Sequence, residues 1–227
     1  MAQPSAMMVS MKNPRFVTGE YYHVYNRGND HRKIFSSSYD LERFLQCMEE
    51  FNSVEPIGSI YEASFLDPKI VARRKRKRLV KFVAYGINPN HYHFILRQVA
   101  EGGISEFMKR LGGGYTWYFN NNQKRSGYLF QGIFKARHID SNEYFLHLSA
   151  YVNLNYRVHK LSGGTAKLSK SSWDEYIGDR EESFCDKDIV LKQFKNKSEY
   201  KEFAESSLED ILEKKQRDKD LNNLLLE

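Results

Sequence analysis

An α+β fold is predicted by the order in which extended and helical patterns follow one another along the 227 residues. Aromatic and β-branched residues at 21–25 and apolar runs at 79–87 and 91–96 are typical of strands, and apolar residues at helical spacing occupy the segments between and after them. The order strand, helix, strand, strand, helix, strand is that of the ferredoxin-like βαββαβ unit. We therefore expect one antiparallel sheet with helices on one face, followed by a small C-terminal helical appendage.

Composition and charge exclude several classes of protein. A hydrophobic content of 41% favours a packed domain over a disordered chain, and a net charge of +6 favours a polyanionic partner, nucleic acid first. Cys47 and Cys185 lie far apart without Cys-x-x-Cys spacing, which argues against a disulfide framework or a thiolate zinc site. No apolar run has the length of a membrane span, so we expect a cytoplasmic protein without a membrane partner.

Three regions are expected along the chain. Residues 1–16 contain two prolines and no periodic pattern, which is typical of a flexible leader. Residues 17–160 contain every strand and helix pattern of the βαββαβ unit. Residues 161–227 begin with a linker rich in glycine, serine and lysine and continue as a helical extension without a chemical motif.

The individual elements follow from local patterns. A helix is expected after the serines at 36–38, and the Asn-Pro-Asn turn at 88–90 predicts a hairpin between the second and third strands. A second helix is expected at 104–122, although the three glycines in its middle are typical of a kink. Residues 128–139 form an extended stretch, and Asp140 with Glu143 predicts the capped start of a last helix that ends near residue 159.

Six consecutive cations precede the second strand. A run this dense repels itself, so a solvated loop is one interpretation. The other is an arm that contacts nucleic acid, because phosphate contacts supply much of nucleic-acid affinity. The run consists of Arg73, Arg74, Lys75, Arg76, Lys77 and Arg78.

A His-x-His pair begins the third expected strand. Because successive side chains alternate between the faces of a strand, His91 and His93 point to one face while Tyr92, Phe94 and Leu96 point to the other. Neutral imidazole binds divalent metals, and two imidazoles on a rigid strand form half of a metal site. Two ordinary surface histidines are the alternative interpretation of so short a motif.

The last expected helix supplies the candidate partners of this pair. Tyr151 and Asn155 are four residues apart and therefore share a helix face, where the Asn155 carbonyl oxygen can act as a third metal ligand beside Tyr151. A phenol needs a neighbouring cation or base to act as a nucleophile at neutral pH. Tyr115 is a rival nucleophile, but Phe119 four residues on is no ligand, which favours a core or base-stacking role. His23 is expected to be structural or a DNA contact.

Four short motifs together resemble the single-tyrosine (Y1) transposases of the IS200/IS605 type, which are HUH nucleases. The chain looks closest to the branch associated with repetitive extragenic palindromes. The resemblance covers roughly residues 18–160, with a weaker echo at 173–203. The motifs are Pro-Asn-His-Tyr-His at 89–93, Tyr-His-Val-Tyr-Asn-Arg-Gly at 22–28, Leu-Phe-Gln-Gly at 129–132 and Tyr-Val-Asn-Leu-Asn at 151–155.

The resemblance implies an HUH fold and a metal-dependent enzyme that nicks and rejoins single-stranded DNA. In that family pattern Tyr151 matches the nucleophile that forms a 5′-phosphotyrosine link, and His91, His93 and Asn155 match the ligands of Mg²⁺ or Mn²⁺. The implied partner is a DNA hairpin formed by a folded single strand. The cations expected to contact it are Arg27, Lys135 and Arg137 together with the six of the run at 73–78.

Two positions depart from the family pattern. Tyr156 follows Asn155 where proline is usual, and Ile133 stands where arginine is usual, so a weakened or domesticated enzyme is one alternative. A second alternative is a binding module for single-stranded DNA or RNA that has lost cleavage. A third is a nuclease of the replication-initiation type, or one acting on RNA, that uses the same histidine pair. The oligomeric state stays open between monomer and homodimer.

Overall fold

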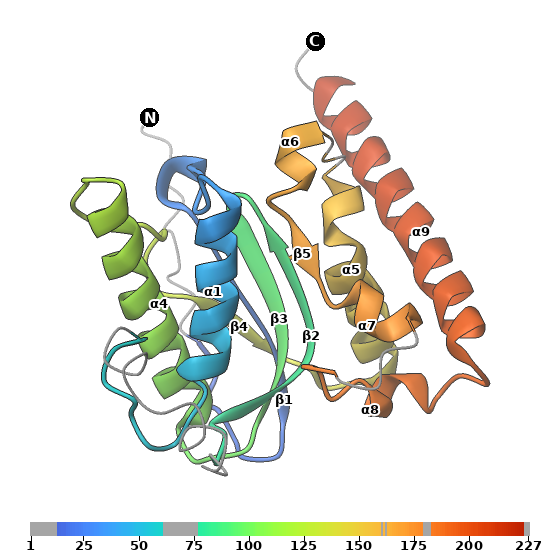
Figure 1. Cartoon of the computed structure of the whole chain (residues 1–227). Coiled ribbons are helices and arrows are strands. Elements are labelled where there is room, and N and C mark those ends of the chain that lie inside the picture. Colours follow the sequence, from blue (N-terminus) through green and yellow to red (C-terminus); the bar gives the residue numbers. More distant parts are fainter. Residues whose placement is uncertain (1–12, 61–76, 160, 162, 179–182, 225–227) are drawn as a thin grey trace, which may run out of the picture.

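The computed structural model places one antiparallel sheet between two groups of helices (Figure 1). It describes residues 13–60, 77–159, 161, 163–178 and 183–224. The elements of the described part are β1 (Tyr21–Arg27), η1 (Asn29–His31), α1 (Ser38–Glu50), β2 (Val80–Asn88), β3 (His91–Gln98), α4 (Gly103–Asn122), β4 (Lys135–His138), α5 (Asn142–Val158), α6 (Gly163–Ala166), β5 (Lys170–Ser171), α7 (Trp173–Ile177), α8 (Asp188–Leu191) and α9 (Lys197–Leu224).

The strand order in the sheet is β4-β1-β3-β2-β5, and every neighbouring pair is antiparallel. The first six main elements run β1-α1-β2-β3-α4-β4, which confirms the predicted βαββαβ order. The two-residue β5 comes from the C-terminal region and pairs with the outer edge of β2. Residues of the predicted helical extension therefore complete the sheet.

Helices α1 and α4 cover one face of the sheet, as predicted. The β3 residues Tyr92, Phe94 and Leu96 are at most 1% exposed on this face. The ring of Phe44 on α1 lies 4.9 Å from that of Tyr115 on α4 in an edge-to-face arrangement. Full burial of each such side chain contributes roughly 1.5–3 kcal/mol. This aromatic core holds β3 rigidly in place.

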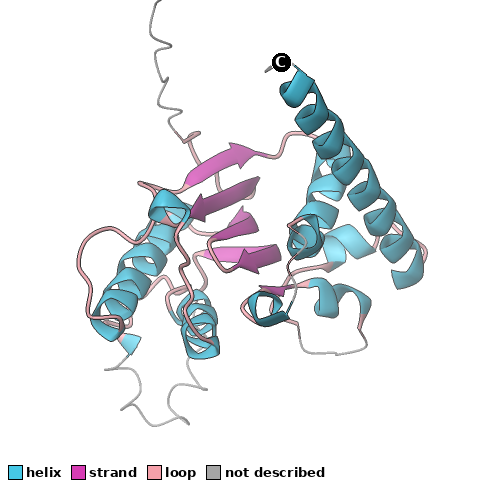
Figure 2. Ribbon diagram, turned by 90° about the horizontal axis from the view of Figure 1, so that it is seen from above, coloured by secondary structure: helices cyan, strands magenta, loops and turns pink. Residues whose placement is uncertain are grey.

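Helix α5 lies against the other face, with α7 and α9 packed around it on the side away from α1 and α4 (Figures 1 and 2). The expectation of helices on one face is therefore right for α1 and α4 and wrong for α5. The reason lies in β2 and β3, where Ala84 and Ile95 point to this second face and are fully buried there. An apolar second face has to be covered, and Val152 on α5 provides part of the cover.

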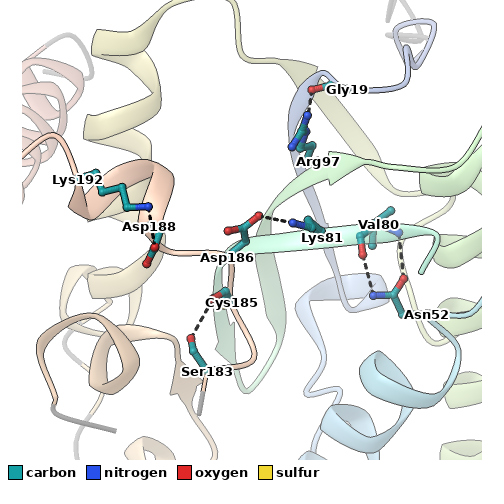
Figure 3. Close-up of polar contacts among 10 residues, drawn as sticks. All are labelled: Gly19, Asn52, Val80, Lys81, Arg97, Ser183, Cys185, Asp186, Asp188 and Lys192. Carbon is teal, nitrogen blue, oxygen red and sulfur yellow. Dashed lines mark hydrogen bonds and ion pairs between the residues drawn. The ribbon is translucent and has the colours of Figure 1, made fainter. Parts of the chain in front are cut away.

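Polar contacts at the start of β2 connect the strand to segments distant in the sequence (Figure 3). The Lys81 ammonium lies 2.9 Å from the Asp186 carboxylate, and the Asp186 backbone N–H donates to the Phe82 carbonyl over 2.7 Å. On the α1 side, the buried Asn52 amide donates to the Val80 carbonyl over 2.9 Å. An exposed ion pair contributes little, so the backbone and buried amide bonds supply most of this attachment.

Helix α4 runs without interruption through its three glycines, so the predicted kink is absent from it. Gly114 is needed because a Cβ there would lie 2.6 Å from the ring of Phe51 at the end of α1. Gly112 and Gly113 have no such neighbour, since an added Cβ would meet nothing within 4 Å. Close packing of α1 on α4 therefore explains one glycine of the three.

Two local predictions are wrong in detail. The N-cap of α5 is Ser141, whose side chain accepts from the Tyr144 backbone N–H over 3.2 Å, and Asp140 lies one residue too early. The extended stretch at 128–139 forms a strand only at β4, because Gly132 adopts a positive φ of 67° and turns the chain. Among the described residues, no helix is both long and apolar enough to cross a membrane.

Candidate active site on the second face of the sheet

The strand register gathers polar residues on the part of the second face that α5 leaves uncovered. Tyr25 on β1 lies opposite both His93 on β3 and Lys135 on β4, and Arg27 lies opposite His91. Residues directly opposite one another on antiparallel strands share a face. Two imidazoles, a phenol and two cations therefore form one continuous patch.

A pocket of about 340 Å³ opens on this patch. Three of the four residues predicted for catalysis and metal binding line it, and the fourth, Asn155, is buried behind it at 1% exposure. Asn90 in the turn between β2 and β3, Gln131 in the loop before β4 and His159 at the end of α5 complete the wall. The lining residues are Tyr25, Asn26, Arg27, Asn90, His91, His93, Gln131, Lys135, Tyr151 and His159.

A glycine allows α5 to approach the strands closely enough to share this pocket. Gly86 on β2 lies opposite His93, and a Cβ on it would overlap the Val152 carbonyl oxygen and lie 3.5 Å from Asn155 Cβ. Only a residue without a side chain permits this contact. Gly86 therefore positions Tyr151 and Asn155 beside the histidine strand.

His91 and Asn155 meet directly across the strand–helix contact. His91 Nε2 lies 2.9 Å from Asn155 Oδ1 and 3.0 Å from Asn88 Nδ2, while His91 Nδ1 lies 2.7 Å from Asn90 Oδ1. The Asn88 amide also donates to Asn155 Oδ1. The hairpin turn and α5 thus enclose the imidazole in a cluster of three amides.

This donor set is compatible with a divalent cation. When His91 Nδ1–H donates to Asn90 Oδ1, Nε2 keeps its lone pair and faces Asn155 Oδ1 at 2.9 Å. Two ligand atoms at right angles around an octahedral ion such as Mg²⁺ are about 3 Å apart. In the described part of the chain, the buried atoms Asn88 Oδ1 and Asn155 Nδ2 have no hydrogen-bond partner. The cluster therefore contains one acceptor and one donor that are not yet satisfied.

The asparagine amide is essential to this interpretation. Among the described residues, no three His, Cys, Asp or Glu side chains gather in a way that could hold a metal ion. A cation at the pocket would therefore depend on the amide oxygen of Asn155 in addition to His91 and His93.

His93 is held by a second histidine, His23, for which a structural role or a DNA contact is expected. His93 Nδ1 lies 2.9 Å from His23 Nε2 on the neighbouring strand. Burial lowers the pKa of His93 well below its usual value and lowers the pKa of His23 to about 4. Both rings are therefore neutral at neutral pH, and a bond donated by His93 Nδ1–H leaves Nε2 with a free lone pair. The sequence contains a signal for this position, because His23 and Tyr25 are two residues apart on one strand and therefore point to the same face.

Tyr151 stands next to the histidine pair. Its ring centroid lies 5.4 Å from that of His93 in an edge-to-face arrangement, and the side chain is half-buried at the wall of the pocket. Burial raises the pKa of the phenol, and the Asn155 side chain opposes this shift. The hydroxyl is therefore protonated at neutral pH and has to lose its proton when it attacks.

Tyr115, the rival nucleophile, lies in the core on the opposite face. It is fully buried between α1, α4 and the sheet, and its hydroxyl donates to the Ile34 carbonyl over 2.6 Å. Burial is the main cause that raises its pKa far above the usual value of a tyrosine. A substrate on the surface has no access to this hydroxyl.

Gln131 and His159 are among the lining residues of the pocket that were not predicted. The Gln131 side chain accepts from Arg27 Nε, and its backbone N–H donates to the Arg27 carbonyl over 2.8 Å. The ring of His159 lies 4.6 Å from that of His91 at the end of α5. His159 is four residues after Asn155, so helical spacing is a signal that could have identified it.

The predicted DNA-binding cations divide into two groups. Arg27 and Lys135 line the pocket, and the exposed Arg137 lies beside it with its guanidinium 4.8 Å from the Tyr144 ring. The run at 73–76 lies outside the described residues. Lys77 is exposed, and Arg78 forms a 2.6 Å ion pair with Glu49 just before β2 begins. The nine-residue β2 separates this end from His91 by roughly 30 Å.

The positions that depart from the family pattern lie outside the pocket lining. Ile133 is 78% exposed and borders a different cavity beside α4. Tyr156 accepts a 3.0 Å hydrogen bond from its neighbour Arg157. Neither residue removes a group from the cluster around His91.

A histidine pair on a central strand, facing a tyrosine and an asparagine on a helix, is the arrangement implied by the resemblance to Y1 transposases. The family described as "Transposase IS200 like" has a model that matches residues 68–155, a stretch containing His91, His93, Tyr151 and Asn155. This match confirms the resemblance to IS200-like transposases.

A comparison with solved structures also matches the chain to one described as a REP-associated tyrosine transposase bound to a REP hairpin. The two chains are 14% identical, with a TM-score of 0.47, and the alignment covers 77% of this chain and 89% of that chain. No curated protein matches the chain significantly.

Proposed function

We propose that this protein is a transposase that cleaves and rejoins single-stranded DNA through a covalent link to Tyr151. The observation that carries the proposal is the convergence of Tyr151, His91, His93 and the buried Asn155 at one pocket on the sheet. The match to the IS200-like family supports the same class of reaction.

In the proposed reaction, the Tyr151 hydroxyl oxygen attacks a backbone phosphorus and loses its proton. The bond between phosphorus and the 3′ oxygen breaks, and that oxygen leaves as a 3′-hydroxyl after taking up a proton. The 5′ phosphate stays on Tyr151 as a phosphotyrosine. Rejoining is the reverse reaction, in which a 3′-hydroxyl attacks the phosphotyrosine and the phenol regains its proton.

The surrounding side chains have roles that fit this chemistry. Arg27 and Lys135 line the pocket and would neutralise and orient the phosphates on either side of the scissile bond. His91, His93 and Asn155 would hold Mg²⁺ or Mn²⁺, which supplies polarisation of a phosphoryl oxygen when bound.

The proposed partner is a DNA hairpin formed by a folded single strand. Cations on β1 and β4 suit its phosphates, and aromatic side chains exposed elsewhere on the described surface suit its unpaired bases. The solved structure mentioned above is described as bound to a REP hairpin. We keep a binding module that has lost cleavage as the alternative outcome of the test.

The test is incubation with labelled single-stranded oligonucleotides from the DNA that flanks the gene, with and without Mn²⁺, followed by denaturing electrophoresis and mass spectrometry. We expect a Mn²⁺-dependent adduct on Tyr151 that disappears in Tyr151→Phe. The matched control is Tyr115→Phe on the covered face, which should keep the adduct and lower the free energy of unfolding by about 1 kcal/mol through loss of a buried hydrogen bond. Tight binding without an adduct under any metal would contradict the proposal.

A further inference from the structure

A second cavity, of about 540 Å³, lies between α4 and the loop at 128–134 and takes no part in the site described above. We call it the α4 pocket. Its walls are mainly apolar, and Lys109 is the cation among its lining residues. The lining consists of Asn26, Tyr92, Ser105, Met108, Lys109, Gly112, Gly113, Thr116, Trp117, Tyr128, Leu129, Phe130, Gly132, Ile133 and Phe134.

Large apolar side chains are exposed around the mouth of this pocket. Trp117 is 68% exposed, Tyr128 is 86% exposed and Ile133 is 78% exposed. Among the described residues, they are three of the four most exposed large hydrophobic side chains, and the fourth is Tyr39 on α1 at 75%. Single exposed hydrophobic residues are ordinary, whereas three around one cavity indicate a ligand with an apolar surface.

Two of the residues that line the α4 pocket are glycines that the fold itself does not require. Gly112 and Gly113 lie in the middle of α4, where each costs about 1 kcal/mol relative to alanine. An added Cβ at either position would meet nothing within 4 Å, in contrast to Gly114 against Phe51. No neighbouring part of the described chain therefore accounts for these two glycines. They leave a flat, open surface on the helix.

One stripe of α4 combines this flat surface with an aromatic ring and a cation. Lys109, Gly113 and Trp117 are spaced at intervals of four residues, so they lie in line along the helix. The Lys109 side chain is 81% exposed, and the Glu106 carboxylate lies 4.0 Å away. A planar group resting on Gly113 would have the indole on one side and an ammonium on the other.

The α4 pocket adjoins the pocket that holds Tyr151. Asn26 lines both cavities, and its amide donates to the Gly132 carbonyl over 3.3 Å. Gln131 lines the Tyr151 pocket, and the next residue, Gly132, lines the α4 pocket. None of the described residues lining either cavity is acidic, whereas Arg27, Lys135 and Lys109 are basic. The two adjoining cavities are therefore together complementary to a polyanion that carries planar apolar groups.

We propose that the α4 pocket binds an unpaired base of the single-stranded DNA next to the scissile phosphate. The base stacks on Trp117 over Gly112 and Gly113, and its phosphate lies towards Lys109. This inference rests on the proposed function, because it takes single-stranded DNA as the substrate. Aromatic stacking of an unpaired base is a general means of holding single strands.

The test uses single-stranded oligonucleotides from the flanking DNA, each with one base replaced by the fluorescent analogue 2-aminopurine. Binding is measured with Tyr151→Phe as the parent protein, so that cleavage does not interfere. We expect fluorescence quenching at one base near the cleavage position. Trp117→Ala should remove this quenching and weaken binding about tenfold, whereas Trp117→Phe should keep most of both.

A second variant separates ligand binding from folding. Gly113→Leu should raise the melting temperature, because leucine is the better helix former and its Cβ has open space, yet it should weaken binding as strongly as Trp117→Ala. The control Tyr39→Ala removes an equally exposed ring on α1 outside the α4 pocket and should change neither quenching nor affinity.

The outcomes distinguish this inference from the proposed function. If the wild-type protein forms the Tyr151 adduct while Trp117→Ala and Gly113→Leu bind as tightly as the parent, the base site is overturned and the proposed reaction stands. If no adduct forms but binding depends on Trp117, the base site stands and the reaction is overturned. Absence of any binding to single strands would overturn both, and preference for the corresponding RNA strands would overturn the DNA assignment.

Discussion

The two faces of the sheet differ sharply, although the same strands build both. Along β3, Tyr92 and Phe94 are almost completely buried under α1 and α4, whereas His91 and His93 point the other way and line the Tyr151 pocket. The first face is an apolar aromatic core. The second carries imidazoles, amides and cations where α5 leaves it uncovered. Alternate residues of one strand thus serve stability and chemistry.

The comparison also shows where the chemistry lies within the second face. Helix α5 covers the β2 side of this face with apolar residues such as Val152. Tyr151 and Asn155 lie at the edge of the covered area, next to the pocket. Groups at this edge are shielded enough to have shifted pKa values and exposed enough to meet a substrate.

The largest effect is expected from His91→Ala on the polar side of β3. Cleavage should fall by more than about a hundredfold with most hairpin binding retained, because the imidazole contributes to the metal ligands and the cations supply affinity. The measurements are single-turnover cleavage and a Mn²⁺ titration followed by electron paramagnetic resonance. His138→Ala, which removes an imidazole paired with Glu20, is the control and should leave both unchanged. An unaltered cleavage rate in His91→Ala would remove His91 from the metal site.

Gly86→Ala tests the contact that brings α5 to the strands. The new methyl group would overlap the Val152 carbonyl, so the free energy of unfolding should fall by about 1–3 kcal/mol and cleavage should weaken as Tyr151 and Asn155 move. Urea denaturation measures the first effect. Gly112→Ala adds the same group in open space and should raise stability by up to about 1 kcal/mol. Equal stability of the two variants would refute the close-approach argument.

His23→Ala tests whether the second histidine positions His93. Loss of its hydrogen bond should weaken Mn²⁺ binding by about 10- to 100-fold, which is the usual effect of removing a partner of a metal ligand. His23→Gln retains a carbonyl oxygen that can accept from His93 Nδ1–H and should restore part of the affinity. A lower melting temperature with unchanged Mn²⁺ affinity would show that the role of His23 is structural only.

The smallest effect is expected from the cations of the second face. Replacing Arg27 and Lys135 by glutamine should weaken binding of all single strands by a similar factor, and the salt dependence should decrease by about 0.7 per lost phosphate contact. Affinity measured across a range of salt concentrations gives this slope. Arg78→Gln is the control, because Arg78 pairs with Glu49 at the far end of β2. A larger change of the salt dependence in Arg78→Gln would show that the main DNA contact lies at that end of β2.

Several features of the site could be predicted because they depend on neighbours in sequence. Alternation along β3 separates His91 and His93 from the core residues, and the four-residue spacing on α5 places Tyr151 and Asn155 on one side. The same helical reasoning applied to His159 would have added it to the site. Tyr115 was disfavoured because Phe119, four residues on, is no ligand, and both side chains lie in the core.

Other features were missed because they depend on contacts between distant segments. The pairing of His23 with His93 requires the register of β1 against β3, and the amide cluster requires the hairpin turn to meet α5. Helical cover of the second face was also missed, although β2 is buried along almost its entire length, which is typical of a central strand covered on both faces.

The sequence by itself determined the order of the elements, the face on which each strand residue lies and the kinds of group available for chemistry. These properties follow from backbone geometry and from side chains within a few positions of one another. Only the tertiary structure decided that α5 crosses β2 at Gly86, that His91 meets Asn155, and that two glycines of α4 lie in a pocket beside Trp117. Such contacts depend on how the layers pack, because bringing distant residues to within bonding distance is a property of the whole fold.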